Sequence, residues 1–235
     1  MNRIASRILQ KILENKVVRK LIQRPVGFLF HSLIVQKTNN FSDVEWLGDP
    51  IWQNVFDLWN TQEVISMLRP ELIIECGTNR AGSAIYYAQL MDLLEIEGKV
   101  VSIDIEKLHD RSHPKVTFLI GSSVSDEMLD AVEGFTQEVL GPVLVILDSN
   151  HDYEHVLQEL DRYHRFVTKD SYLSVQDGCI DVIPHFRSGR PGPLPAIEKF
   201  VSESSEFVVD TELCERFLIT HHPKGWLKKI GGDAE

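Results

Sequence analysis

A carboxylate and an imidazole follow the most continuous apolar run of the chain. Val143–Leu147 is uniformly apolar, which indicates a strand buried on both faces of a parallel sheet. Asp148 ends this run, and His151 follows three residues later, before an amphipathic stretch. Because functional residues of open α/β sheets lie beyond the carboxyl ends of strands, this pair is placed to hold a metal or to move a proton. Alternatively, Asp148 caps the next helix and His151 is an exposed loop residue.

A glycine-containing loop, ECGTNRAGS at Glu75–Ser83, follows an earlier predicted strand. Gly77 allows backbone angles that other residues avoid, and Gly82 allows a helix start to approach a neighbour or a ligand closely. Asn79 and Ala81 stand where a dinucleotide fingerprint has further glycines. The loop therefore indicates either a ligand-binding turn or a plain strand–turn–helix junction.

Acidic and hydroxyl side chains end the next two predicted strands. Asp104 lies 27 residues beyond Gly77, at a place where a carboxylate can accept both hydroxyls of a ribose. Its alternative is a loop carboxylate without a ligand. Ser122 and Ser123 follow the strand after that, where they either line an adenine pocket or cap the following helix.

A second carboxylate is expected near Asp148. The sequence VQDG ends a further predicted strand, so Asp177 and Asp148 terminate neighbouring strands and can converge on one divalent cation. Gln176 offers a carbonyl oxygen to such a site but no charge.

Alternating strands and helices must position these residues. The predicted strands are Leu72–Cys76, Val100–Asp104, Val116–Ile120, Val143–Asp148 and Tyr172–Asp177, and the predicted helices are Thr61–Leu68, Ser83–Glu95, Ser125–Leu140 and Tyr153–Phe166. This alternation predicts an α/β fold with a mostly parallel sheet covered by helices. The final third has a different pattern: a Gly/Pro loop (Ser188–Pro195), a short helix near Ala196–Ser202, and a closing antiparallel strand pair at Phe207–Val209 and Arg216–Thr220.

Composition limits the class of protein. The 235 residues are 43% hydrophobic and 25% charged, which fits one globular domain with additions. The net charge of −11 combines about +6 in residues 1–24 with −17 in the remainder, and a body this acidic repels a phosphate backbone. We therefore do not expect nucleic acid to be the substrate. Three sparse cysteines fit reduced thiols in a cytoplasmic protein.

The basic N-terminal segment has helical periodicity. Apolar residues recur every three to four positions up to Ile22, with cations between them, and Pro25 is expected to end the helix before the apolar run Val26–Val35. Three interpretations remain: a helix docked on the body or on a second subunit, a peripheral membrane anchor, or a signal peptide. The expected division is a basic extension over residues 1–37 and one domain over residues 38–235.

These motifs together resemble a known group. The chain is similar to the cephalosporin hydroxylase family, which has the Rossmann-like fold of S-adenosylmethionine-dependent methyltransferases and includes macrocin-type sugar O-methyltransferases as relatives. The resemblance covers roughly Asp43–Ile230. It rests on the segments WLGDPIWQ, IIECGTNRAGSA, VVSIDI, GSS, VLVILDSNHDYEHV, SYLSVQDG, GPLPAIEKF and ERFLITHHPKGWLKKI.

The resemblance implies roles for individual residues. It places Glu75, Gly77, Thr78 and Ser83 in the methionine-binding loop, Asp104 at the ribose, Asp148 and Asp177 among the Mg²⁺ ligands, and His151 at the catalytic base. Where the family pattern has Glu-Asp after the fifth strand, this chain has Gln176-Asp177, which predicts a weaker cation site. His155 is expected on a helix surface, and His221 and His222 are candidates for the acceptor mouth.

The expected activity is S-adenosylmethionine-dependent O-methylation of a hydroxyl on a sugar, a glycan or a polyhydroxylated metabolite, with Mg²⁺ as an optional second cofactor. An alcohol is a poor nucleophile at neutral pH, and a histidine can take its proton. The alternatives are a hydroxylase-associated protein and a non-catalytic cofactor-binding protein. The apolar stripe of the N-terminal segment also leaves a homo-oligomer open.

Overall fold

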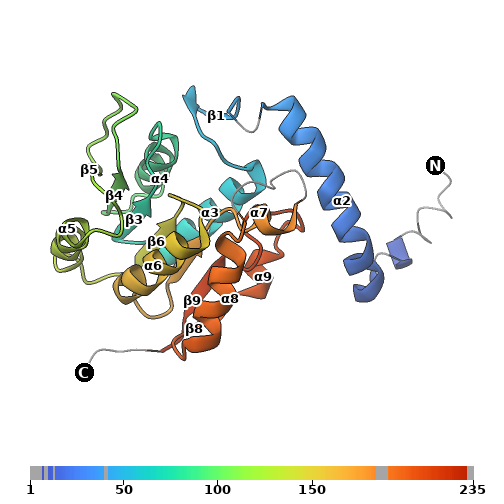
Figure 1. Cartoon of the computed structure of the whole chain (residues 1–235). Helices are drawn as coiled ribbons and strands as arrows, with labels where there is room; N and C mark the ends of the chain where they lie inside the picture. Colours follow the sequence, from blue (N-terminus) through green and yellow to red (C-terminus); the bar gives the residue numbers. More distant parts are fainter. Residues whose placement is uncertain (1–6, 8–9, 13, 40–41, 184–189, 232–235) are drawn as a thin grey trace.

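A seven-stranded sheet forms the centre of the molecule (Figure 1). The computed structural model describes residues 7, 10–12, 14–39, 42–183 and 190–231. The strand order is β5-β4-β3-β6-β7-β9-β8, and the first five of these strands are parallel. β9 runs antiparallel to both of its neighbours. The strands are β3 (Leu72–Cys76), β4 (Lys99–Asp104), β5 (Val116–Ile120), β6 (Val143–Leu147), β7 (Tyr172–Val175), β8 (Phe207–Val209) and β9 (Trp226–Lys229).

Helices connect the strands and cover both faces of the sheet. They are α2 (Lys16–Lys37), α3 (Val55–Leu68), α4 (Gly82–Leu93), α5 (Asp126–Thr136), α6 (Tyr153–Tyr163), the 3₁₀ turn η1 (His164–Phe166), α7 (Cys179–Val182), α8 (Pro193–Glu203) and α9 (Thr211–Cys214). A small hairpin of β1 (Glu45–Trp46) and β2 (Asp49–Pro50) precedes α3.

Alternate residues of the strands face two separate hydrophobic cores. In β6, Val145 packs with Val132 of α5 and Leu160 of α6 on one face. The next residue of β6, Ile146, packs with Ile65 of α3 on the other face. Because both faces are covered, β6 is apolar throughout rather than alternating. The predicted α/β class, with a mostly parallel sheet and C-terminal antiparallel strands, is confirmed.

The five predicted parallel strands are all present, with ends that differ by at most two residues. The predicted helix at Thr61–Leu68 begins earlier, at Val55, because the Asn54 side chain caps it by accepting a hydrogen bond from Phe56 N. Part of the predicted Gly/Pro loop, residues 188–189, lies outside the described residues. The short helix predicted near Ala196–Ser202 is α8, and it begins at Pro193.

The predicted strand at Arg216–Thr220 is wrong. The partner of β8 is β9, Trp226–Lys229. The backbone at Leu218 has a φ of 65°, which is incompatible with an extended strand, and Thr220 donates a hydrogen bond to Asp57 of α3. The buried Trp226 instead fixes the strand that follows this turn.

The prediction that Pro25 ends the N-terminal helix is also wrong. α2 continues through Pro25 to Lys37. Pro25 is exposed, and so is Leu21, whose carbonyl lacks the usual N–H donor four residues later. Because this carbonyl lies on the solvent side, water can replace the missing donor and the helix persists.

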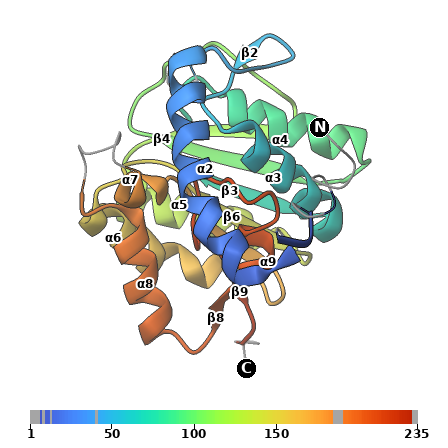
Figure 2. The ribbon, with the colours of Figure 1, turned by 90° about the vertical axis from the view of Figure 1, so that its right-hand side faces the viewer.

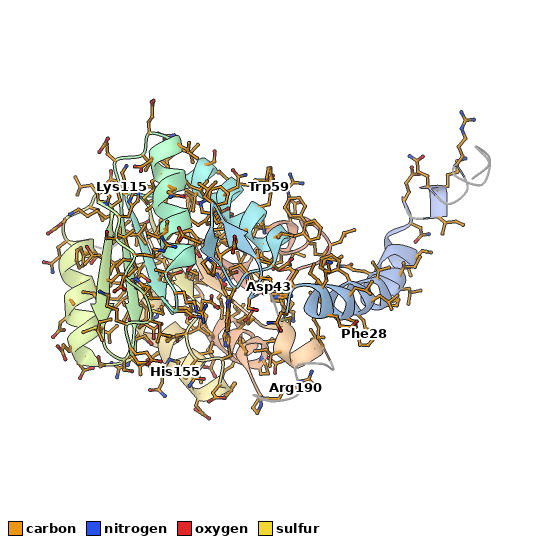
Figure 3. The ribbon with its side chains drawn as sticks, turned by 90° about the horizontal axis from the view of Figure 1, so that it is seen from above. Phe28, Asp43, Trp59, Lys115, His155 and Arg190 are labelled. Atoms are coloured by element: carbon orange, nitrogen blue, oxygen red, sulfur yellow. The ribbon has the colours of Figure 1, made fainter. Side chains whose placement is uncertain are left out.

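One face of α2 rests on the body, and Figures 1 and 2 show the helix crossing one side of the molecule. The Phe30 ring lies 5.5 Å from that of Phe56, and Gln23 donates to the carbonyl of Leu218. His31 is 4% exposed and bonds to His221. Seen from above in Figure 3, the helix, marked by Phe28, points away from the sheet.

The outer face of α2 exposes large apolar side chains. Val17, Leu21, Leu29 and Leu33 are between 58% and 71% exposed. None of the described helices combines the length and the apolarity that crossing a bilayer requires.

Candidate active site

A cavity of about 690 Å³ opens at the carboxyl edge of the sheet, above β4, β3 and β6. Among the residues that line it are Gln53, Thr78, Ser83, Asp104, Ser123, Asp148, His151, His155 and Asp177. The sheet therefore brings together predicted site residues that are far apart in the sequence. The volume of the cavity is within the usual range for small-molecule sites.

The glycine loop passes very close to the neighbouring strand end. Gly77 has a φ of 104°, and a Cβ there would lie 2.1 Å from the carbonyl oxygen of Asp148. A Cβ on Gly82, at the start of α4, would lie 2.0 Å from the carbonyl oxygen of Pro50. Only glycine fits either position without displacing backbone. This close packing sets the floor of the cavity beside Thr78 and Ser83.

Asp104 sits at the end of β4 with its carboxylate at the cavity wall. Its Oδ2 accepts a hydrogen bond of 2.7 Å from the backbone N–H of Asn79, so it also fixes the glycine loop. Carboxylate oxygens have more acceptor capacity than this single strong bond uses.

Glu75 does not line the cavity. It is fully buried, and its Oε2 accepts from the hydroxyl of Ser102 at 2.5 Å, while that hydroxyl lies 2.6 Å from Thr78 Oγ1. Burial raises the pKa of Glu75 to about 8, so at neutral pH it is mainly the uncharged acid. Glu75 therefore reaches the cavity only through hydroxyl side chains: Ser102, which contacts Thr78, and Ser83.

His151 lies between two carboxylates. Its Nε2 is 3.4 Å from Asp148 Oδ1 and 3.3 Å from Asp177 Oδ2. Burial by itself lowers the pKa of His151, but the hydrogen bond to Asp148 and the charges of Asp177 and Asp148 raise it to about 9. Burial also raises the pKa of Asp148, so the pair holds its shared proton firmly. One ligand atom from each of the three residues lies within 4.8 Å of the others, as a metal site requires.

Gln53 is a site residue that the sequence analysis missed. Its side-chain Nε2 donates to Asp148 Oδ2 at 2.8 Å and to Gln176 Oε1 at 2.6 Å. Gln176 is 3% exposed and lies behind Gln53 rather than at the cavity wall. Gln53 stands in the segment WLGDPIWQ, and its position in a shared motif was the available signal.

His155 is not the surface residue that was predicted. Its Nε2 lies 3.1 Å from Ser149 Oγ and 3.3 Å from Glu159 Oε1, and its ring lines the cavity. Glu159, one helical turn further along α6, is buried, and it was also missed. Ser123 lines the cavity beside them, whereas Ser122 turns its carbonyl to Ser125 and does not.

His221 and His222 do not line the cavity, contrary to the prediction. Both are buried, because Asp57 accepts from the backbone N–H of His221 and holds this turn against α3. His222 Nδ1 accepts from the backbone N–H of Asp177, and so supports that residue from behind.

The chain matches a protein family over most of its length. The sequence profile described as Rhamnosyl O-methyltransferase/CmcI matches residues 38–230. A rhamnosyl O-methyltransferase of Mycobacterium bovis (strain BCG / Pasteur 1173P2) is 34% identical over 187 residues, which cover 77% of this chain and 76% of that protein. A rhamnosyl O-methyltransferase of Mycobacterium leprae (strain TN) is 29% identical over 219 residues, covering 89% and 94%.

Solved structures share the fold. A CmcI structure with Mg and SAM has a TM-score of 0.63 and 16% identity, and the match covers 82% of this chain and 78% of that one. A CmcI structure with SAH has a TM-score of 0.61 and 17% identity, covering 82% and 85%. These similarities confirm the predicted Rossmann-like fold.

Proposed function

Since the chain belongs to the Rhamnosyl O-methyltransferase/CmcI family, we propose that it transfers a methyl group from S-adenosylmethionine to a hydroxyl of a sugar. The observation that carries this proposal is the single cavity that holds Asp104 at one wall and Asp148, His151 and Asp177 at another. A cofactor and an acceptor alcohol can meet there. The relatives' names make a rhamnosyl residue the first acceptor to test.

The cofactor is expected to lie across the carboxyl ends of β3 and β4. Asp104 would accept the two ribose hydroxyls, and hydrogen bonds to a charged acceptor contribute roughly 1.5–3 kcal/mol each. Thr78 and Ser83 line the cavity at the glycine loop and would receive the methionine portion. With the cofactor held in this way, the acceptor hydroxyl would be methylated near Asp148 and His151, at the end of β6.

His151 is the proposed base. In the transfer, the acceptor oxygen forms a bond to the methyl carbon, the carbon–sulfur bond breaks, and the sulfonium becomes a neutral thioether. The hydroxyl proton must leave, and His151 at the cavity wall can accept it when its ring is neutral. Asp148 and Asp177 both lie within 3.4 Å of Nε2 and orient the ring. Holding the acceptor hydroxyl in line with the methyl group and its sulfur also increases the rate of transfer.

The residues present fit a hard divalent cation. Asp148 and Asp177 offer carboxylate oxygens whose spacing suits a shared ion, and Gln176 adds a neutral carbonyl oxygen behind them. Bound there, Mg²⁺ would polarise the acceptor hydroxyl and lower its pKa. Because Gln176 carries no charge, the site should bind Mg²⁺ more weakly than one with three carboxylates.

An exposed aromatic side chain supports a sugar acceptor. Trp52 lines the cavity and remains 52% exposed, so its ring is available at the opening. An indole presents an apolar face together with a polar N–H, which suits the mixed surface of a pyranose. The acceptor would stack on Trp52 with one hydroxyl directed to His151.

The direct test is methyl transfer to defined acceptors. Purified protein, S-adenosylmethionine and Mg²⁺ are incubated with rhamnosyl, glucosyl and galactosyl glycosides, and products are identified by mass spectrometry and NMR. We expect a mono-O-methylated glycoside together with S-adenosylhomocysteine. Cofactor binding without transfer to any hydroxylated acceptor would support the non-catalytic alternative instead.

We also propose that α2 contacts an anionic membrane surface. Its outer face is apolar, as Val17, Leu21, Leu29 and Leu33 show, and its other face is occupied by the body. The segment up to Arg24 carries a net charge of about +6, whereas the rest of the chain is strongly acidic. An apolar helix face beside a cationic segment is the combination by which interfacial helices bind anionic lipid.

A further inference from the structure

A buried carboxylate lies beneath one end of the cavity. Glu159 of α6 is 1% exposed and does not itself reach the cavity. Its Oε1 accepts hydrogen bonds from Ser123 Oγ at 2.5 Å and from Ser149 Oγ at 2.6 Å. Both serines line the cavity. The carboxylate therefore acts on any ligand only through these two hydroxyls and the adjacent His155.

The protons on these side chains determine whether the cavity wall formed by Ser123 and Ser149 donates or accepts hydrogen bonds. A serine hydroxyl has one proton and two lone pairs, and an ionised carboxylate can only accept. Since Ser123 and Ser149 both direct their proton to Glu159, they have only lone pairs left to offer to the cavity. His155 Nε2 lies within 3.3 Å of all three oxygens, and because a carboxylate only accepts, its contact with Glu159 requires a proton on this nitrogen, which makes it a donor.

The position of this wall identifies the part of the cofactor that it meets. Ser123 follows β5 and Ser149 follows β6, and Asp104 ends β4, which lies between these two strands in the sheet. Ile105 and Leu108 add an apolar surface to the same cavity. If Asp104 holds the ribose, as the proposed function requires, the attached base extends over this apolar surface toward the two serines.

We propose that Glu159 makes Ser123 and Ser149 obligate acceptors and thereby selects adenine over hypoxanthine. The exocyclic amino group of adenine donates and matches two acceptors. The carbonyl oxygen that hypoxanthine carries at the same position only accepts. It would therefore meet two other acceptors, the serine oxygens, and form no hydrogen bond with them. Glu159 is thus a specificity-determining residue that acts through the serines, and this role rests on the proposed S-adenosylmethionine site.

The test compares two compounds that differ in this group and in the proton that hypoxanthine carries on the neighbouring N1. S-adenosylhomocysteine and its deaminated counterpart, S-inosylhomocysteine, are titrated calorimetrically into the wild-type protein. We expect the adenosyl compound to bind about ten-fold or more tightly, because sites built for a hydrogen bond reject analogues that lack it. Equal affinities would overturn the inference while leaving the proposed function intact. Failure of both compounds to bind would instead count against the cofactor site itself.

The variant Glu159→Gln tests the mechanism. A glutamine amide has donor hydrogens, so one serine can turn its proton toward the cavity, and the preference for the adenosyl compound should shrink several-fold. Glu154→Gln is the matched control, since Glu154 lies exposed on the same helix. A preference that Glu159→Gln leaves unchanged contradicts the role of Glu159.

A second variant keeps the inference testable if Glu159→Gln does not fold. Ser149→Ala removes one acceptor and leaves Glu159 bonded to Ser123 and His155. The ratio of the two affinities should fall in this variant, whereas a purely structural role would weaken both compounds equally. An unchanged ratio with two weaker affinities would overturn the proposal.

Discussion

The side-chain amide of Gln53 lies 2.8 Å from Asp148 Oδ2 and joins the segment before α3 to the end of β6. The same nitrogen lies 2.6 Å from Gln176 Oε1, so one amide group bridges two of the residues expected to surround a cation. A neutral side chain at position 176 therefore leaves the oxygen cluster with a smaller negative charge than a glutamate would give.

Gln176→Glu should strengthen Mg²⁺ binding. The added carboxylate supplies a third negative charge near Asp148 and Asp177, and Gln53 can still donate to a glutamate oxygen. We expect the dissociation constant for Mg²⁺, measured by calorimetry with S-adenosylhomocysteine present, to fall by about ten-fold, which is about 1.4 kcal/mol. Gln158→Glu adds the same charge at an exposed position of α6 and should change little. Equal effects of both variants would point to overall charge instead.

Asp104→Asn should weaken binding of S-adenosylhomocysteine by about ten-fold or more, which corresponds to roughly 1.4 kcal/mol per decade. The amide keeps an oxygen for the N–H of Asn79 but loses the charge that strengthens bonds to ribose hydroxyls. Calorimetry measures the loss. Asp110→Asn, at an exposed position on the same loop, serves as the control. Unaltered affinity in Asp104→Asn would place the ribose elsewhere.

The strand pattern was predictable because burial on both faces leaves a direct signature in the sequence. β6 is a continuous apolar run that ends where Asp148 follows, and β3 is apolar except for Glu75 and ends before Gly77. The last strand was misplaced because Arg216–Thr220 has apolar residues like a strand. Its conformation is set by Asp57, a residue more than 150 positions earlier, and such a contact has no local signature.

The site was predictable to the extent that strand ends determine it. Asp104 ends a strand, and Asp148 and Asp177 follow strands, so sheet topology alone gathers them at one edge. Gln53 and Glu159 were missed for a physical reason. Gln53 precedes a helix outside the strand alternation, and Glu159 lies on the buried face of α6, where its partners come from two other segments.

His151→Gln should abolish methyl transfer while S-adenosylhomocysteine binding persists. Glutamine can still bond to Asp148 and Asp177, but its amide cannot take a proton at neutral pH. Turnover is measured with the acceptor found in the transfer assay, and binding is measured by calorimetry. His109→Gln, in the loop after β4, is the comparison, because it removes an imidazole that does not line the cavity. Retained turnover in His151→Gln rules out the base assignment.

The pH profile gives a second measurement for His151. In the free protein its pKa is raised to about 9, so protonated His151 predominates at pH 7 and kcat/KM should rise as the pH increases toward 9. Mg²⁺ and the proton on His151 compete for the charge of Asp148 and Asp177, so saturating Mg²⁺ should move this rise to lower pH. If Mg²⁺ does not shift the pH profile, the cation does not bind to the carboxylates that hold the proton on His151.

Acid should weaken the attachment of α2 to the body. Burial first, and then the charge of His221, lower the pKa of His31 to about 4, against 6.5 when unfolded, while Asp57 partly offsets this. A lowered pKa means that the stability contributed by neutral His31 is complete above about pH 6.5 and is lost between pH 6.5 and 4. The melting temperature should fall through this window.

His31→Asn tests that expectation. Asparagine can bond to His221 without titrating, so the variant should lose fewer degrees between pH 7 and pH 5 than the wild type does, at about 2–4 °C per kcal/mol for a chain of this size. Calorimetric melting at pH 8 provides the reference, where the two proteins should differ less. If the melting temperatures of both proteins fall equally between pH 7 and pH 5, the effect comes from groups other than His31.

The exposed face of α2 should bind vesicles that contain phosphatidylserine. Each basic residue near an anionic surface contributes about 1 kcal/mol, so co-sedimentation should require phosphatidylserine in a phosphatidylcholine vesicle and should weaken with added salt. The double variant Leu21→Asp and Leu29→Asp should abolish binding without unfolding the protein, because both side chains are exposed. Leu93→Asp, exposed at the end of α4, should have no effect. If the wild type does not sediment but forms dimers that the double variant disrupts, a second copy of the chain covers this face instead.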